Sequence, residues 1–436
     1  MNRFSDISDV NRYLDRLPSF QVHGAVAARL GLGPMRDFFS RTGRPERSVP
    51  AIHVAGTNGK GSVSAILAKV YQEAGFTCGL FTSPHLMDLR ERFRINGIMI
   101  EEEELIRFFQ LHAGLLEELK PSYFEISVAI AFWWFRERNV DLAVIETGLG
   151  GRLDATNIIV PMISVITSVG YDHMNFLGST IRAIATEKAG IIKEGRPVVI
   201  GSMPATARDV ITRIAEKHGS ELLDARSMRP RFTAENHTKG IRSRIRFNEN
   251  GRRIEVNTDL AAPVQRWNVA MARLVTILLN PDYPVSLPLF QRAIRDVHGR
   301  GWLPGRFERL HPRLPWYFDG AHNTEAVGSL IDTIQRHEWG TEPVMVLSLM
   351  KDKAEKKILT PFSVFKKNYY YTLHMERAAD ITQITPYLPD IKPLPPQEEE
   401  IIDFLAGLEE QVVIFTGSFY FYSRVKRWIS RIIRTL

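Results

Sequence analysis

The sequence predicts an α/β protein made of two domains, each built around an open sheet. Short apolar runs alternate with helical patterns along most of its 436 residues, as in parallel sheets covered by helices. Proline and glycine accumulate at residues 288–304, and the alternation resumes beyond them. We therefore expect one domain at residues 1–295 and a second at residues 296–436.

The composition indicates a globular protein of the cytoplasm. Hydrophobic residues make up 44% and charged residues 24% of the chain, which are ordinary values for a soluble domain. We find neither an apolar run of about 18 residues nor a basic start followed by an apolar block, and so expect no membrane span and no secretory signal. Cys78 is the only cysteine, which excludes an internal disulfide and fits a reducing compartment.

The formal charge of +7 leaves two kinds of anionic partner open, a nucleic acid and a polyanionic small molecule. Basic residues are scattered, except near residues 424–427, where they alternate with apolar residues as on the solvated face of a terminal helix. We expect small-molecule ligands, no nucleic acid and a monomer.

A glycine-rich turn near the start of the first sheet predicts a phosphate-binding loop. Residues 51–55 form an apolar strand pattern, and residues 63–71 have helical spacing. Between them, inward-facing amides and the helix N-terminus would surround an anion, with Lys60 on the outer phosphates and Ser62 on Mg²⁺ or phosphate. The strict P-loop pattern is not met, because Gly61 separates Lys60 from the hydroxyl, so an ordinary glycine turn is the alternative. The loop residues are Gly56, Thr57, Asn58, Gly59, Lys60, Gly61 and Ser62.

Two further strand patterns end in groups that could bind a metal ion. Residues 141–146 end in Glu146, and residues 162–167 are followed closely by His173. Ligands of open parallel sheets gather at the carboxyl ends of the strands, where an acid suits Mg²⁺ and a neutral imidazole is a plausible ligand. The alternatives are that Glu146 caps the following glycine turn and that His173 is structural.

The rest of the first domain reads as helices and short strands around this P-loop ATPase core. Helical patterns cover much of residues 2–45, then residues 101–119, 123–135 and 206–218 and a stretch starting near residue 266. Strand patterns occur at residues 79–82 and 197–201. Residues 220–260 predict a small antiparallel subdomain, with strands 242–247 and 252–256 around a turn. In the second domain, strands 316–319, 344–349, 369–373 and 412–416 alternate with helices and predict a Rossmann-like sheet. Residues 386–396 read as a proline-rich surface connection.

Motifs between residues 30 and 422 resemble the folate branch of the Mur ligase superfamily, the folylpolyglutamate synthases and dihydrofolate synthases. They include G-T-N-G-K-G-S, T-S-P-H-L…E-R-F-R-I-N-G, E-T-G-L-G-G-R-L-D-A-T-N, G-Y-D-H, E-K-A-G-I-I-K, P-G-R-F, D-G-A-H-N and G-S-F-Y. The chain departs from the family pattern after Leu30, where Gly33 and Pro34 replace a Glu-Arg pair, and at Thr324, which replaces a proline.

The resemblance implies a role for each matching residue of the first domain. It implies Mg²⁺ ligation, with two ions, by Ser83, Glu146 and His173. It implies that Lys188 is carbamylated and that Asn268 contacts ATP. Phe124 would stack on a pterin ring and Asp154 would hydrogen-bond to it. The implied substrate-binding residues of this domain are Leu30, Phe124, Glu125, Asp154 and Ala155.

In the second domain, the resemblance implies that Arg306 and Asp319 serve ATP and that His322 and Ser418 lie on the glutamate side. Lys60, Lys188 and His322 would be the catalytic residues. The implied reaction is ATP-dependent ligation of L-glutamate to a reduced folate, and also to dihydropteroate, through an acyl phosphate. A cell-wall amino-acid ligase and a non-enzymatic nucleotide-binding protein remain the alternatives. The sequence leaves open the preferred folate and its glutamate chain length.

Overall fold

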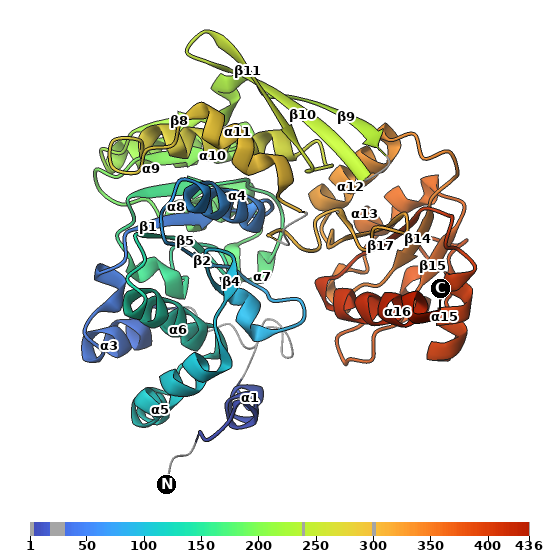
Figure 1. Ribbon diagram of the computed structural model, residues 1–436, viewed down its shortest axis with the longest axis horizontal. Coiled ribbons are helices and arrows are strands. Elements are labelled where there is room, and N and C mark those ends of the chain that lie inside the picture. The colour runs from blue at the N-terminus through green and yellow to red at the C-terminus, as the bar shows by residue number, and fades with distance from the viewer. Residues whose placement is uncertain (1–3, 18–30, 238–239, 299–301, 436) are drawn as a thin grey trace. The chain divides into compact units, whose positions relative to one another are not determined.

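The computed structural model describes residues 4–17, 31–237, 240–298 and 302–435. The chain divides into two compact units, each with its own sheet (Figure 1). The first unit comprises Met1–Pro230, Phe247–Ile254 and Trp267–Ile294. The second unit comprises Arg231–Arg246, Glu255–Arg266 and Arg295–Leu436. This division runs through the hairpin between two long strands, β10 and β11, described below.

The first unit is built on an eight-stranded sheet of order β4-β3-β2-β5-β1-β6-β7-β8. Six strands are parallel, and β3 and β4 add an antiparallel edge. The five predicted parallel strands are confirmed, each with ends within a residue of the structure. The strands are β1 Ala51–Ala55, β2 Cys78–Phe81, β3 Phe93–Ile95, β4 Ile98–Met99, β5 Leu142–Glu146, β6 Ile163–Ile166, β7 Val198–Ile200 and β8 Leu222–Asp224.

Helices cover both faces of this sheet. Figure 1 shows α3, α5 and α6 on one side of it and α10 and α11 on the other. The helices are α1 Ile7–Asp15, α3 Gly33–Arg41, α4 Lys60–Glu73, α5 Glu102–Leu119, α6 Tyr123–Glu137, α7 Met174–Leu177, α8 Ile181–Ala189, α9 Ala205–Lys217, α10 Gln265–Leu278 and α11 Leu287–Ala293. Short 3₁₀ turns link them, of which η3 Leu89–Arg92 and η4 Ala155–Ile158 matter for the site.

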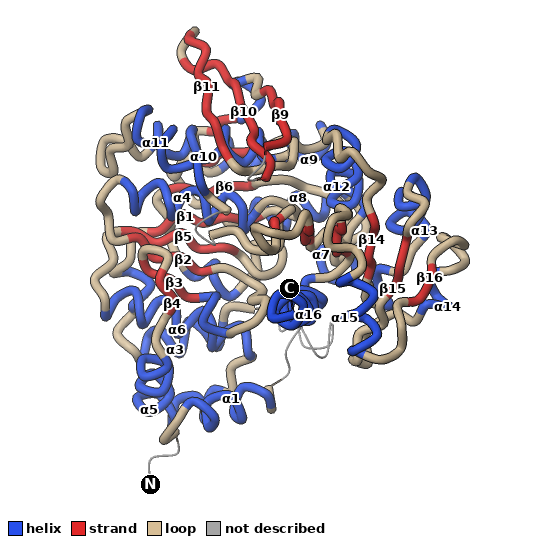
Figure 2. The backbone as a smooth tube through the Cα atoms, turned by 45° about the vertical axis from the view of Figure 1, so that its right-hand side comes forward, coloured by secondary structure: helices blue, strands red, loops and turns tan. Residues whose placement is uncertain are grey.

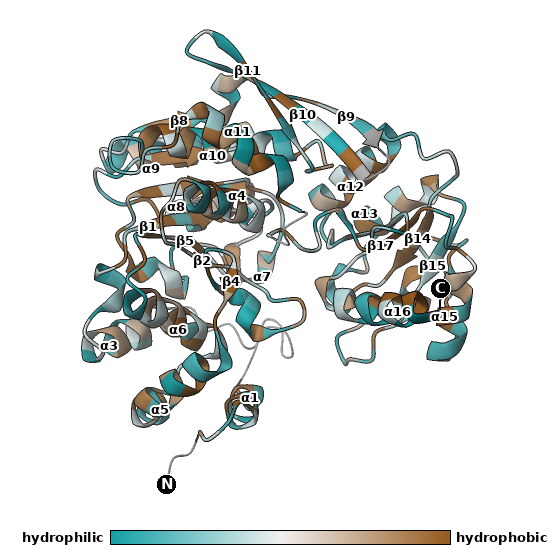
Figure 3. Cartoon of the chain, in the orientation of Figure 1, coloured by the Kyte–Doolittle hydropathy of each residue, from teal (hydrophilic) through white to brown (hydrophobic). Residues whose placement is uncertain are grey.

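The largest aromatic cluster of the first unit lies on the α6 face of the sheet. The predicted stripe Trp133, Trp134 and Phe135 is buried there, with Phe81 from β2 and Phe93 from β3. Burial of such rings removes a large apolar area from water and fixes α6 on the sheet. Figure 3 shows the same division, with hydrophobic strands inside and hydrophilic residues along the outer helices. The carboxyl ends of β1, β5 and β6 therefore form a rigid platform for the loops that follow these strands.

A three-stranded antiparallel sheet confirms the prediction of a small antiparallel subdomain for residues 231–258, whereas the prediction was wrong for Leu222–Asp224, which forms β8 of the parallel sheet. Its strands are β9 Arg231–His237, β10 Gly240–Glu249 and β11 Arg252–Thr258, in the order β11-β10-β9. Asn250 and Gly251 form the tight turn between β10 and β11, with φ of 50° and 77°. This is the backbone that an Asn-Gly pair favours in a two-residue hairpin. Figure 2 shows these strands as a separate ribbon of long strands.

The second unit contains an open sheet of order β12-β13-β17-β14-β15-β16. The four predicted strands are confirmed and pair in parallel, while β12 is antiparallel. The proline-rich connection was only partly right, since Lys392–Pro393 forms β16 at the edge, where a missing amide is tolerated. The other strands are β12 Glu308–Arg309, β13 Trp316–Asp319, β14 Val344–Leu347, β15 Asn368–Tyr370 and β17 Val413–Thr416. The helices are α12 Thr324–Arg336, α13 Lys356–Leu359, α14 Ile381–Ile384, α15 Glu398–Ala406 and α16 Tyr422–Thr435.

In the described part of the chain, no helix has both the length and the apolar character needed to cross a bilayer.

Candidate functional site

The glycine-rich loop after β1 is fastened to the segment that follows β6. The Thr57 amide donates to the Ser168 carbonyl at 3.0 Å, and the Asn58 amide donates to Ser168 Oγ at 2.9 Å. The Thr57 hydroxyl donates to the Gly170 carbonyl at 3.2 Å and accepts from the Gly170 amide at 3.0 Å. The amides of Thr57 and Asn58 are thus engaged within the protein, and an anion at this loop would be bound by the amides that follow them.

Two glycines of this loop are required by close approach. A Cβ at Gly56 would lie 1.9 Å from Thr167 Oγ1, so any side chain there would push the loop off β6. Gly59 has φ of 88°, and a Cβ on it would lie 2.8 Å from Asn268 Oδ1. Asn268, predicted as a contact of ATP, is buried on α10 against this loop.

The loop ends at the N-terminus of α4, where it has the features of an anion site. Gly59 caps the helix without a side-chain hydrogen bond. Amides of a first helical turn have no partner within the helix and carry its positive end. Lys60 Nζ donates to the Gly56 carbonyl at 2.9 Å and to the Thr57 carbonyl at 3.3 Å, so its charge lies over the loop. This arrangement can hold a phosphate.

Glu146 lies beside the phosphate loop at the end of β5, the neighbour of β1 in the sheet. Its Oε2 accepts the Ser83 amide at 3.1 Å, which brings two of the three predicted metal ligands together. A Cβ at Gly61 would lie 3.7 Å from the same carboxylate oxygen, so Glu146 faces the start of α4. A carboxylate and a hydroxyl are hard oxygen donors of the kind that Mg²⁺ prefers, and these residues therefore fit the ion.

His173, the third predicted metal ligand, forms the start of α7 in a left-handed conformation with φ of 49°. Its Nε2 lies 3.8 Å from Asp172 Oδ1. Among the residues that the structure describes, no three His, Cys, Asp or Glu side chains form a group that could hold a metal ion. A direct contact joins two of the predicted ligands, Glu146 and Ser83, through the Ser83 amide.

Lys188 on α8 is buried, with 3% of its surface exposed, whereas a lysine on a helix usually lies at the surface. The glycine turn after β5 packs on this part of α8. A Cβ at Gly151 would lie 2.8 Å from the Glu187 carbonyl oxygen and 2.9 Å from that of Lys188. The Arg152 amide donates to the Glu187 carbonyl at 2.7 Å, and its guanidinium pairs with the Glu187 carboxylate at 2.8 Å. The two motifs that contain these residues form one packed unit.

Asp154, predicted to bind a pterin, is 4% exposed and organises the loop around it. Its Oδ2 accepts the Leu149 amide at 2.8 Å. Its Oδ1 accepts the Thr156 amide at 3.0 Å and also the Thr156 hydroxyl. Burial raises the pKa of Asp154, while these hydrogen bonds act in the opposite direction. Ala155, the next predicted residue, is buried in η4.

The predicted stacking residue Phe124 lies against the backbone of the same loop. A Cβ at Gly148 would lie 2.5 Å from the Phe124 ring, so the glycine leaves room for the ring. Glu125 is buried, and its carboxylate accepts the Ser122 amide at 2.7 Å in a capping box at the start of α6. The structure thus gives Glu125 a helix-capping role. Leu30 lies outside the described residues, and Gly33 and Pro34 begin α3.

Three residues of the segment after β2 organise it in a way that the sequence analysis did not anticipate. The Glu91 carboxylate accepts the amides of Leu86, Met87 and Asp88 at 2.8–3.0 Å. Arg92 Nε donates to His85 Nδ1 at 2.9 Å. Burial and the Arg92 charge lower the pKa of His85 to about 3, so its ring is neutral. The charged residues of this motif therefore rigidify the loop that starts at Ser83.

In the second unit, Asp319 at the end of β13 ties two predicted motifs together. Its carboxylate accepts the Phe307 amide and the Ala321 amide, each at 2.9 Å. Burial raises the pKa of Asp319 to about 6, against the opposing effects of the Arg306 charge and these two amides. Asp319 thus holds the P-G-R-F loop beside the D-G-A-H-N turn.

Phe419 is the residue of this region that sequence reasoning missed. The Arg306 guanidinium lies over its ring at 4.3 Å, and the His322 ring packs edge-on at 5.8 Å. A Cβ at Gly320 would lie 2.1 Å from the ring, so this glycine is required by close approach. Its neighbour Ser418 is 4% exposed and accepts the Tyr420 amide at 3.3 Å. Phe419 occupies the variable position of its motif, which is why no sequence signal marked it.

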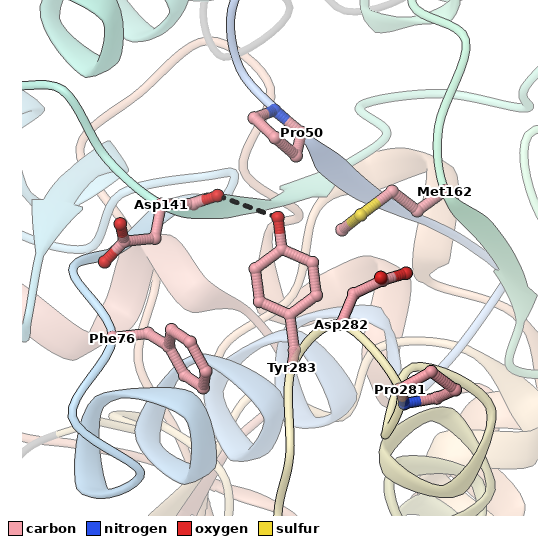
Figure 4. Close-up of a pocket in the computed structure, with 7 residues that line it drawn as sticks. All are labelled: Pro50, Phe76, Asp141, Met162, Pro281, Asp282 and Tyr283. Carbon is pink, nitrogen blue, oxygen red and sulfur yellow. Dashed lines mark hydrogen bonds between the residues drawn. The ribbon is translucent and has the colours of Figure 1, made fainter.

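A surface pocket of the first unit lies away from the predicted site. Figure 4 shows Tyr283 at its centre, with the hydroxyl donating to the Asp141 carbonyl at 3.1 Å. Pro50, Asp141 and Met162 precede β1, β5 and β6, so the pocket opens at the amino ends of these strands. The phosphate loop and Glu146 lie at the opposite, carboxyl ends. The lining residues are Pro50, Phe76, Asp141, Met162, Pro281, Asp282 and Tyr283.

Comparison with known proteins supplies the family context. Residues 54–276 match the model of the Mur ligase middle domain. A Bacillus subtilis protein named dihydrofolate synthase/folylpolyglutamate synthase is 34% identical over 424 residues, which cover 93% of this chain and 97% of that protein. A Lacticaseibacillus casei folylpolyglutamate synthase is 31% identical over 410 residues, covering 88% and 91%. An Escherichia coli structure described as FolC in complex with DHPP and ADP has a TM-score of 0.83 and 27% identity, and 99% of each chain is covered.

Proposed function

This chain belongs to the folylpolyglutamate synthase/dihydrofolate synthase group of the Mur ligases, and on that premise we propose that it joins L-glutamate to a pteroyl substrate with consumption of ATP. The pteroyl substrates are a reduced folate and dihydropteroate. The proposal makes the chain an ADP-forming acid–amino-acid ligase, which acts in the cytoplasm as a monomer.

The geometry of the glycine-rich loop after β1 is the observation that carries the proposal. Lys60 lies over a loop whose glycines are fixed by close approach to Thr167 and Asn268, at the N-terminus of a 14-residue helix. Such a loop binds phosphates through backbone amides and a mobile lysine. Glu146 beside it supplies the carboxylate that ATP-using enzymes place near the metal ion.

The chemistry proceeds in two steps. An oxygen of the substrate carboxylate attacks the terminal phosphorus of ATP, the bond to ADP breaks, and an acyl phosphate forms. The amine of L-glutamate then attacks the acyl carbon, so that an amide forms and phosphate and a proton leave. We assign Lys60 and Arg306 to the phosphate charge, which they would stabilise as it develops. No protein nucleophile is needed, because positioning and charge stabilisation supply the catalysis.

We assign Ser83, Glu146 and His173 to two Mg²⁺ ions, which when bound would neutralise phosphate charge. Lys188 carries a carbamate in this proposal. The reaction of a lysine with CO₂ needs a neutral amine, and the Lys188 side chain is buried, away from bulk water. The carbamate would add an oxygen donor near the turn at Gly151, which packs against the Lys188 backbone.

We assign the pteroyl end of the substrate to the loop after β5. Phe124 offers an aromatic face and Asp154 a carboxylate that accepts hydrogen bonds from adjacent donors of a pterin. Leu30 and Ala155 complete this assignment, and Glu125 supports it by holding the start of α6. In the second unit we assign Asp319 and Arg306 to ATP and His322 and Ser418 to glutamate. Residues 1–295 would thus be the ATP-binding domain and residues 296–436 the glutamate-ligase domain.

Product analysis tests the proposal. The protein is incubated with MgATP, L-glutamate and either dihydropteroate or tetrahydrofolate, and the products are examined by mass spectrometry. The proposal predicts a pteroyl product heavier by one glutamyl residue, with one ADP formed per ligation. Ligation that requires a cell-wall precursor in place of the pteroyl compound, or ATP binding without any ligation, would contradict it.

A further inference from the structure

His53 lies in the middle of β1 and is completely buried, although the proposed reaction gives it no role. Its Nε2 is 2.8 Å from the hydroxyl of Thr156, which is also completely buried. Thr156 in turn contacts Asp154 through both its amide and its hydroxyl. A continuous chain of polar groups therefore runs from the central strand of the sheet to the carboxylate that we assign to the pterin.

The contacts of Asp154 fix the direction of this chain. A carboxylate only accepts hydrogen bonds, so the hydroxyl proton of Thr156 points to Asp154 Oδ1. The oxygen of Thr156 is then free to accept, and the Nε2–H group of His53 donates to it. Each hydrogen bond fixes the direction of the one before it. His53 therefore donates to Thr156, and Thr156 donates to Asp154.

The other nitrogen of His53 supports the same order. Nδ1 is buried and has no hydrogen-bond partner among the residues that the structure describes. If the proton were on Nδ1, a buried N–H group would lack an acceptor, which costs more than an unused lone pair. Burial and the charge of Lys193 lower the pKa of His53 to about 3, so the ring carries a single proton at neutral pH. Lys193 itself donates to Asn157 Oδ1 at 2.7 Å.

We propose that His53 is a positioning residue that, through Thr156, holds Asp154 as a hydrogen-bond acceptor for the pterin of the substrate. The inference rests on the proposed function, because it takes the ligand to be a pterin. A pterin presents adjacent donor groups, which require an acceptor. If these hydrogen bonds ran in the opposite direction, a protonated Asp154 would donate to Thr156 and would offer the ligand fewer lone pairs. His53 opposes that reversal because its Nδ1 has no acceptor.

The neighbouring strand offers a matched control. Ser164 lies directly beside His53 in the sheet register and is equally buried. Its hydroxyl donates to the Ile191 carbonyl at 2.9 Å and does not lead to Asp154. Ser164→Ala thus removes a buried hydrogen bond at the same level of the sheet, and it reports the cost of such a loss without the proposed effect.

The test measures kcat/KM for the pteroyl substrate and KM for ATP in His53→Phe, Thr156→Val, the double variant, Thr156→Ser and Ser164→Ala. Dihydropteroate and tetrahydrofolate are assayed in parallel, and circular dichroism and thermal melting check the fold. The dissociation constant of dihydropteroate without ATP gives a second readout. We expect His53→Phe to lower kcat/KM for the pteroyl substrate about tenfold and to weaken its binding similarly, with KM for ATP changed by less than about twofold.

The double variant separates positioning from packing. If His53 acts through Thr156, then His53→Phe should add nothing to Thr156→Val, because the hydroxyl that it orients is gone. Thr156→Ser should retain wild-type kinetics, and Ser164→Ala should lower the melting temperature only. Additive losses in the double variant, or equal losses on ATP and the pteroyl substrate, would overturn the inference and leave the proposed function intact. A wild-type protein that ligates neither pteroyl substrate would overturn both.

Discussion

The two units position their predicted residues by different means. In the first unit, hydrogen bonds between loops do this work, as in the contacts of Thr57 with Ser168 and Gly170. In the second unit, two hydrogen bonds to Asp319 join the loops, and an aromatic ring is added at the centre, with Arg306 and His322 both packed on Phe419. Hydrogen bonds fix direction as well as distance, whereas packing on a ring fixes mainly distance. We therefore expect the first unit to respond sharply to loss of single polar groups and the second to changes of shape.

Glycine has the same purpose in both regions despite this difference. Gly56 admits the hydroxyl of Thr167, and Gly320 admits the ring of Phe419. In each case a Cβ would come within about 2 Å of the neighbour, which no small adjustment relieves. Close backbone approach therefore explains why glycines recur in these motifs, whichever side chain they face.

The largest effect is expected at Lys60. Lys60→Ala removes the charge over the phosphate loop, and ligation should fall by at least about a hundredfold, as when other donors to a developing anionic charge are removed. The measurement is ATP-dependent incorporation of glutamate. Lys69→Met is the control on the same helix, because Lys69 is buried and pairs with Glu73 at 3.4 Å. It should alter stability more than KM for ATP. Near-normal turnover of a folded Lys60→Ala protein would contradict the assignment of Lys60 to the phosphates of ATP.

A second large effect is expected at Lys188. An apolar side chain cannot replace a buried polar group of the first unit, even where it fills the space. Lys188→Ala should lose most activity, and a short carboxylic acid should restore part of it by replacing the carbamate. The modification itself is checked by ¹³C NMR after exposure to labelled bicarbonate. No carbamate signal, together with no rescue by the acid, would contradict the assignment.

A smaller loss is expected from a change of shape in the second unit. Gly320→Ala should displace Phe419 and with it Arg306 and His322, lowering kcat/KM for glutamate about tenfold or more. The control is Gly328→Ala on α12, where a Cβ meets nothing within 4 Å. That variant should gain about 0.5–1 kcal/mol of unfolding free energy, since alanine favours a helix interior, and keep its activity. Equal kinetics for the two variants would show that the Phe419 cluster does not position the site.

The smallest effect concerns stability and pH in the second unit. Burial raises the folded-state pKa of Asp319 from its ordinary value of about 4 to about 6. The folded protein therefore holds this proton more tightly than the unfolded chain, and stability falls as pH rises from about 4 to about 6. Asp319→Asn should remove that part of the pH dependence. The difference in unfolding free energy between wild type and Asp319→Asn should change by at most about 3 kcal/mol between about pH 4 and about pH 6. A difference that is constant with pH would contradict the raised pKa.

The sequence was sufficient for most of the fold because local pattern and global structure agree. The strands at residues 51–55 and 163–166 are mostly apolar, with one polar residue each, His53 and Ser164, and they could be recognised without any tertiary information. The edge strand β16 escaped recognition because it has two residues, one of them proline. Its pairing with β15 depends on the rest of the sheet.

For the site, the sequence predicts residues whose chemistry follows from a motif, such as Lys60 and Glu146. It could not identify residues whose role depends on contact between distant segments. Phe419 lies 113 positions from Arg306 in the chain, and His53 lies 103 positions from Thr156. The helix-capping role of Glu125 was likewise not predicted, because helix capping and ligand binding use the same residue type, and its assignment to the substrate stays a prediction.

Isotope transfer tests the central claim most directly. The pteroyl substrate is prepared with ¹⁸O in its carboxylate and turned over with MgATP and L-glutamate. If the reaction passes through an acyl phosphate, one labelled oxygen should leave with the inorganic phosphate, and the amide should keep the other. Label that stays wholly in the pteroyl product, or AMP formed in place of ADP, would contradict the account.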